Sequence, residues 1–280
     1  MKIHLKNDRL WEQTKADCSK CAGLCCTALF FSKTDGFPQN KAAGVPCINL
    51  LGNYRCKIHS CLEQQKMKGC IGYDCFGAGQ QVTQVVYKGK AWRDLPEQAA
   101  EIFDVFTVLF QIQQIRYFLT EALTLNPAAP YKRDVQDMMD QNIIICSGSP
   151  DDILCFDVDA YRNSVNTVLK QICALLRQNL HSKGKRSPKS FLGKAFKGED
   201  LSWLDFSTKL LIAADFTGCT FDGTIFLGAD TRDANFTSAD LREAVFLTQG
   251  QINSAKGSRD TKIPGHLDYP ATWKRYITSM

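Results

Sequence analysis

Nine of the thirteen cysteines in this 280-residue chain lie in one short stretch near its beginning. They are Cys18, Cys21, Cys25, Cys26, Cys47, Cys56, Cys61, Cys70 and Cys75. Thiols at this density indicate either disulfides or a metal-thiolate site. Residues 1–15 are polar and charged and lack the apolar segment of a signal peptide. We therefore expect a cytoplasmic protein, whose reducing surroundings keep thiols free, and we expect metal rather than disulfides.

The spacing of the first cysteines suits metal ligation. Cys18 and Cys21 form a Cys-x-x-Cys knuckle, in which both sulfurs can face one point while turn amides donate to them. Cys21 and Cys25 are four residues apart and can share one helix face. Cys25 and Cys26 are adjacent and their side chains diverge, so one of them belongs to a second site or stays free. His59 is the one candidate ligand nearby that is not a thiolate.

The identity of the cofactor stays open between zinc and an iron–sulfur cluster. Eight thiolates suffice for two closed zinc sites, and four hold one iron–sulfur cubane. The competing interpretations are separate thiols in a reduced core or disulfides in an unusual compartment. The remaining cysteines lie alone or in apolar periodic positions, where a thiol behaves as a small buried hydrophobe. They are Cys146, Cys155, Cys173 and Cys219.

Several motifs in this region resemble a known family. They are the Cys-Cys pair behind the knuckle, Pro46-Cys47-Ile48-Asn49-Leu50, Arg55-Cys56-Lys57-Ile58-His59 and Gly69-Cys70. Residues 18–80 thus resemble the YkgJ-type cysteine-cluster family, described as zinc- or iron-chelating. The chain lacks the Arg-Pro that this family commonly has before its last cysteine, and Cys61 and Cys75 look additional. A similar motif occurs in a flagellin lysine methylase, so the resemblance implies a metal site and allows an enzyme.

Residues 84–182 carry the apolar periodicity of helices. The spacing predicts one helix over Asp94–Leu125, a shorter one over Arg133–Ile145, and a third beginning after Ser149-Pro150-Asp151-Asp152. We expect a small bundle that packs against and positions the cysteine region. Residues 183–190 combine Gly, Pro, Ser and positive charges, which predicts a linker.

The last region has a five-residue period. Its bulky centres are Phe191, Phe196, Leu201, Phe206, Leu211, Phe216, Phe221, Phe226, Phe236, Leu241 and Phe246, with Thr231 at the one weak position. A period of five matches neither a helix nor a strand. It suits a chain that turns a corner after every five residues and stacks its bulky centres inside.

Three segments carry a second resemblance: Ala-Asp-Phe at 214–216, Ala-Asn-Phe at 234–236 and Ala-Asp-Leu at 239–241. They resemble the pentapeptide-repeat family, which implies a right-handed quadrilateral β-helix of about three coils. The expected fold class is therefore α+β and multidomain. Its parts are a metal-binding region (1–83), a helical bundle (84–182), a linker (183–190), a β-helix (191–250) and a capping segment (251–280).

The function that these features predict is an intracellular metal-binding protein whose repeat serves as a scaffold or docks a protein partner. One alternative is a metal- or iron–sulfur-dependent modifying enzyme. Another is a topoisomerase-interacting DNA mimic, as some pentapeptide-repeat proteins are. Nine acidic and five basic residues between 191 and 250 leave a net charge of only −4, on a rod of about 14 Å. The total charge of +5 does not favour nucleic-acid binding, and no apolar run suits a membrane span.

Overall fold

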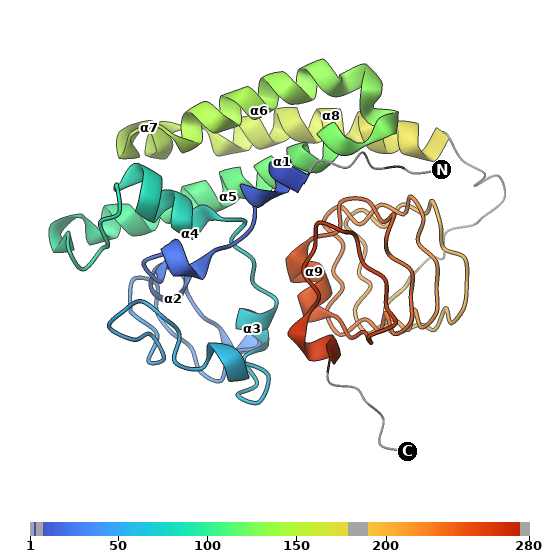
Figure 1. Ribbon diagram of the computed structural model, residues 1–280, viewed down its shortest axis with the longest axis horizontal. Helices are drawn as coiled ribbons and strands as arrows, with labels where there is room; N and C mark the ends of the chain where they lie inside the picture. Colours follow the sequence, from blue (N-terminus) through green and yellow to red (C-terminus); the bar gives the residue numbers. More distant parts are fainter. Residues whose placement is uncertain (1–2, 4–7, 179–189, 275–280) are drawn as a thin grey trace.

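The computed structural model describes residue 3 and residues 8–178 and 190–274. A layer of long helices lies along one side, with the cysteine-rich loops and a stack of coiled turns side by side beneath it (Figure 1). Among the described residues, no helix has the length and apolar character needed to cross a membrane. Residues 183–189 of the expected linker (183–190) lie outside the described part of the chain, and only its last residue is described.

The helical layer is built around α5 (Ala99–Thr124), which packs against α6 (Lys132–Cys146), α7 (Pro150–Cys155) and α8 (Val158–Gln178). Buried residues lie on more than one side of α5. The predicted helices over Asp94–Leu125 and Arg133–Ile145 are thus confirmed within a few residues at each end.

The third predicted helix is confirmed at its start but is divided in two. The Ser149 side chain accepts a hydrogen bond from the Asp152 amide, and the Asp152 carboxylate accepts from the Ser149 amide. Helix α7 then ends, because Phe156 is extended and the carboxylate of Asp157 accepts a hydrogen bond from Ala160 (2.9 Å) at the start of α8.

The cysteine region consists of loops interrupted by very short helices. These are α1 (Asp8–Glu12), α2 (Leu24–Ala28), α3 (Lys68–Ile71) and α4 (Ala78–Gln80), with 3-10 turns at Cys18–Lys20, Lys33–Asp35 and His59–Cys61 and a π-helical turn at Gln81–Val86. Elements this short have little stability of their own. Their positions therefore depend on tertiary contacts.

Residues 191–247 wind into a stack of turns, here called the coil stack (Figure 1). Single-residue backbone bridges join positions 20 residues apart, such as Ala195 with Asp215 and Asp215 with Asn235. The bulky centres are buried, and the rings of Phe196, Phe216 and Phe236 stack with successive centroids 5.5 and 5.4 Å apart. The prediction that the centres lie inside is therefore confirmed.

The expected β-helix and α+β class are nevertheless wrong, because the described residues contain no β-strand and no sheet. A residue with positive φ recurs at every fifth position: Gly193, Gly198, Trp203, Thr208, Ala213, Gly218, Gly223, Gly228, Asp233 and Ser238. Each such residue bends the chain out of the extended conformation. Between two successive corners, only one residue pairs with the residue 20 positions further along the chain. Each bridge therefore remains a single residue pair and does not extend into a strand.

The coil stack packs against the helices along one side. Its last turn is covered by α9 (Gln249–Ser254) and the residues that follow it. Ile225 and Val245 belong to the same apolar core as the helices, and Arg177 of α8 pairs with Asp205 (3.2 Å). Over the last turn, Lys256 and Lys262, which follow α9, continue the bridges to Asn235 and Asp240. The stack and the helical layer therefore share a core.

A buried carboxyl group at this junction provides a test of the packing. Glu121 of α5 is fully buried and accepts a hydrogen bond from the Phe246 amide (2.7 Å). Burial raises its pKa from 4.5 to about 8, so the fold favours the protonated form. The unfolded chain releases this proton at lower pH, and the stability of the fold therefore falls as pH rises from about 4.5 to about 8.

In Glu121→Gln the side chain keeps an oxygen that can accept the hydrogen bond but can no longer ionise. We therefore expect the variant not to lose stability as the pH rises. Above pH 8 the variant should be more stable than the wild type by roughly 2 to 4 kcal/mol, and the two should converge near pH 4.5. Urea unfolding at pH 5 and pH 8.5 measures the difference, with exposed Glu97→Gln as the control. Parallel pH profiles for wild type and Glu121→Gln would show that this carboxyl group is not buried as described.

Candidate metal centre

Four of the nine predicted cysteines line one small cavity of about 20 Å³. This pocket set consists of Cys18, Cys21, Cys25 and Cys75. The remaining wall comes from Asp17, Gly79, Gln80 and Phe106. The Cys-x-x-Cys knuckle thus lies together with a cysteine more than 50 residues further along the chain.

Turn chemistry places each of these thiols. The Asp17 carboxylate accepts a hydrogen bond from the Ser19 amide (2.8 Å) and caps the turn that carries Cys18. Gly23, with a φ of 66°, opens α2, which carries Cys25. Such a φ is costly for residues with a Cβ, so the glycine allows the chain to reverse between Cys21 and Cys25.

Arg55 connects this knuckle to the loop of Cys56. Its guanidinium donates hydrogen bonds to the carbonyl oxygens of Cys18 and Ser19, the latter at 2.8 Å. It also favours the thiolate of Cys18 and so partly offsets the effect of burial on the pKa of that thiol. Arg55 therefore links the knuckle to the loop of Cys56 and places a positive charge beside the pocket set.

Burial raises the pKa of the pocket-set thiols. Cys18 is exposed as a residue, but its sulfur lines the cavity, and desolvation raises its pKa and that of Cys21. Desolvation raises the pKa of Cys75 to about 12, although the amides of Gly77 and Gly79 favour its thiolate. These thiols are protonated at neutral pH, so a metal that binds them must displace the protons.

A second group of four cysteines, the outer set, lies next to the first. It consists of Cys26, Cys47, Cys56 and Cys70. The Cys47 amide donates to the Cys26 carbonyl (2.9 Å), and a backbone bridge joins Leu50 to Cys56. Burial raises the pKa of Cys70 to about 12, and the charges of Cys26, Cys56 and Cys47 raise it further, so these three thiols lie within electrostatic reach of Cys70.

The two sets meet at Cys25 and Cys26, whose sulfurs are 3.9 Å apart. The hydrogen bond between the two thiols lowers the pKa of Cys26 and raises that of Cys25 well above its usual range. The positive charge of Lys41 also lowers the pKa of Cys26. Adjacent residues thus present one sulfur to each set.

The remaining predicted ligands, Cys61 and His59, are assigned to neither set. Cys61 is close enough to influence Cys56 but does not line the cavity, and His59 is exposed. Over the part of the chain that the structure describes, no three His, Cys, Asp or Glu side chains converge as a coordination sphere. The donors have the chemistry of a thiolate site, and binding a metal requires their sulfurs to draw closer.

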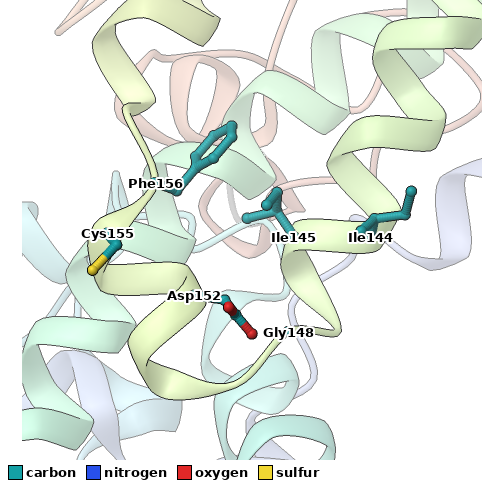
Figure 2. A pocket seen from close by; sticks show the side chains of 6 residues that line it. All are labelled: Ile144, Ile145, Gly148, Asp152, Cys155 and Phe156. Atoms are coloured by element: carbon teal, nitrogen blue, oxygen red, sulfur yellow. The ribbon is translucent and has the colours of Figure 1, made fainter.

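Of the four cysteines expected to be buried, Cys146, Cys173 and Cys219 are buried, whereas Cys155 is exposed. Cys155 borders a larger surface pocket of about 480 Å³ between the end of α6 and α7 (Figure 2). Its other lining residues are Ile144, Ile145, Gly148, Asp152 and Phe156. The Asp152 carboxylate accepts hydrogen bonds from the Ser149 amide (3.0 Å) and hydroxyl (2.6 Å), so it serves as a helix cap.

Gly79 provides a test of how tightly the pocket set is packed. A Cβ at this position would lie 2.5 Å from the Cys21 sulfur, whereas a Cβ at Gly52 would meet nothing within 4 Å. We expect Gly79→Ala to displace Cys21 and lower the unfolding free energy by about 1 to 3 kcal/mol, while Gly52→Ala changes it by less than about 0.5 kcal/mol. Urea unfolding of both variants measures this, and equal effects would argue against the described contact.

Comparisons with known proteins found one family match and one relative that matches over nearly the whole chain. Residues 211–246 match the pentapeptide-repeat family in eight copies. The chain is 40% identical to "Uncharacterized protein YybG" of Bacillus subtilis (strain 168) over 272 residues, which cover 96% of this chain and 98% of that protein. No solved structure matches the chain. The resemblance of residues 18–80 to the YkgJ-type family stays a prediction.

Proposed function

This chain belongs to the same family as the Bacillus subtilis relative, and for it we propose a metal-binding function in the cysteine region. The observation that carries the proposal is the gathering of eight cysteines into the pocket set and the outer set. The structure describes all thirteen cysteines and joins none of them in a disulfide, which suits a reducing compartment such as the cytoplasm.

We propose one zinc ion for each set. The cavity of the pocket set, about 20 Å³, has room for one water-sized occupant, since a site of this kind needs about 10 to 15 Å³. An iron–sulfur cubane contains four irons and four sulfides, so it would require this cavity to widen. Zinc prefers four thiolates in a tetrahedral arrangement, which matches the donors present.

A structural role for the metal is favoured over catalysis. Four thiolates complete a zinc site and leave no open position for a substrate, whereas catalytic zinc keeps one. The cavity beside the pocket set is also too small for a substrate, and the larger pocket is lined by none of the nine clustered cysteines. The bound ions would cross-link loops whose own helices have only three to five residues.

We propose that the coil stack supports the cysteine region. Helix α3, which carries Cys70, packs against α9 over the last turn of the stack. Lys68 pairs with Asp233 (3.1 Å), and Trp11 stacks on His266 with ring centroids 3.7 Å apart. A protein partner would then use the exposed sides of the stack, since one side is already packed on the helices.

Cobalt titration of the metal-free protein under anaerobic conditions tests this proposal. We expect intense sulfur-to-cobalt absorption that saturates at about two equivalents, because each set supplies four thiolates. Absorption that lacks the sulfur-to-cobalt band would exclude thiolate ligation. A broad iron–sulfur spectrum in protein purified anaerobically would instead support the cluster alternative.

A further inference from the structure

Lys41 occupies an unusual position for a surface lysine. Its ammonium group donates to four main-chain carbonyl oxygens, those of Thr27 (3.1 Å), Leu29 (2.6 Å), Ala42 (3.0 Å) and Val45 (2.8 Å). An ammonium has only three N–H donors, and here four carbonyl oxygens share them. The oxygens thus surround the charge as ligands surround a bound cation.

The four carbonyls belong to the two segments that carry Cys26 and Cys47, two of the four outer-set cysteines. Thr27 and Leu29 follow Cys26, and Ala42 and Val45 precede Cys47. The same loops are joined by the backbone bridge between Phe31 and Lys41 and by the hydrogen bond from the Cys47 amide to the Cys26 carbonyl. Lys41 thus fixes the spacing of two outer-set cysteines.

The charge of Lys41 is solvated but not neutralised by these contacts. Carbonyl dipoles carry no net charge, and the ring of Phe31, with its centroid 4.6 Å from Nζ, adds only a cation–π contact. Among the described residues, the groups that act on its charge are the thiols of Cys47, Cys26 and Cys25, and no carboxylate is among them. The positive charge therefore lies within electrostatic reach of these thiols.

We propose that Lys41 is a built-in counter-cation for the outer set. Four thiolates around a divalent ion carry a net charge of −2, and the ammonium reduces this to −1 while its hydrogen bonds hold the Cys26 and Cys47 loops in place. This inference rests on the proposed function and assigns to it a positioning residue that lies outside all of the cysteine motifs.

Two consequences separate this role from ordinary packing. Removing the charge should weaken metal binding to the outer set about 10- to 100-fold, the usual effect of losing a group that supports metal ligands. It should also move metal release to higher pH, because protons compete better for thiolates that lack a nearby cation. A purely structural role would lower the stability of the metal-free protein and leave this pH profile unchanged.

The test is a zinc competition titration of the full chain with a chromophoric chelator, repeated from pH 5 to pH 8 under anaerobic conditions. The variants are Lys41→Met, which keeps the aliphatic stem, Lys41→Arg, which keeps the charge, and Lys33→Met, an exposed lysine in the same hairpin. Thermal melts of each metal-free variant measure any loss of folding.

We expect Lys41→Met to lose about 10- to 100-fold in affinity for one of two zinc ions and to release it at higher pH. Lys41→Arg should lose less, and Lys33→Met should match the wild type. If Lys41→Met kept the wild-type zinc affinity and pH profile, the inference about Lys41 would be wrong and the proposed metal-binding function would stand. Equal losses in Lys41→Met and Lys41→Arg would overturn its charge component, and a wild type that binds no zinc would overturn the proposed function as well.

Discussion

Replacing Phe221 with aspartate is expected to lower the unfolding free energy by roughly 4 kcal/mol or more. Phe221 is fully buried in the coil stack, and its ring centroid lies 5.5 Å from those of both Phe216 and Phe226. The substitution removes these contacts and places a carboxylate among aromatic rings. A loss of this size approaches the whole stability of many domains, about 5 to 15 kcal/mol.

The neighbouring residue provides a matched control. Asp222 is exposed, and desolvation and the charges of Asp240 and Glu243 raise its pKa. Asp222→Lys replaces one of three nearby negative charges, so its effect should stay within about 0.5 kcal/mol. Thermal and urea unfolding measure both variants. If the two melts shifted equally, the inward register of the five-residue repeat would be wrong.

Replacing Cys21 with serine is expected to remove the metal of the pocket set and leave that of the outer set. Zinc content should fall from about two equivalents to about one, because a serine hydroxyl does not replace a thiolate ligand. Cys219→Ser is the control. Cys219 is buried in the coil stack, where its thiol donates to the Phe196 carbonyl (2.8 Å), a hydrogen bond that serine can also make.

Elemental analysis of anaerobically purified Cys21→Ser and Cys219→Ser measures this difference. Equal zinc loss in both variants would contradict the assignment of Cys21 to a ligand set. A loss of both ions in Cys21→Ser alone would show that the two sets do not bind independently. Cys25 and Cys26, whose sulfurs are 3.9 Å apart, would then couple the two sets.

The helices and the inward register of the repeat could be predicted because both depend on local periodicity. Apolar spacing predicts α5 and α6 closely, and Ser149 with Asp152 marks the start of α7. The break between α7 and α8 was missed, since nothing in the apolar stripe signals that the Asp157 carboxylate caps a new helix.

The β-helix could not be excluded from the repeat alone. A period of five predicts a corner every five residues but not how much extended chain separates the corners. In the structure even Trp203 and Ala213 have positive φ, a conformation that the sequence does not signal for such residues. The alignment between successive turns is therefore limited to single bridges.

The division of the cysteines into two sets also lay beyond the sequence. The knuckle spacing brings Cys18 and Cys21 together, but Cys75 joins them only because the chain returns beside the cavity before α4. The exposure of Cys155 and the carbonyl shell of Lys41 likewise depend on tertiary packing. Arg55 had a signal, since it directly precedes Cys56 within a recognised motif.

The most direct test of a metal-binding cysteine region is the metal content of the wild-type chain after anaerobic purification without added metal. Inductively coupled plasma mass spectrometry should find about two equivalents of zinc per chain, one for each set of four thiolates. Labelling of thiols in the native protein should spare the eight cysteines of the two sets until a chelator is added. Less than about a tenth of an equivalent of zinc and iron together, with all eight thiols reactive, would contradict the account.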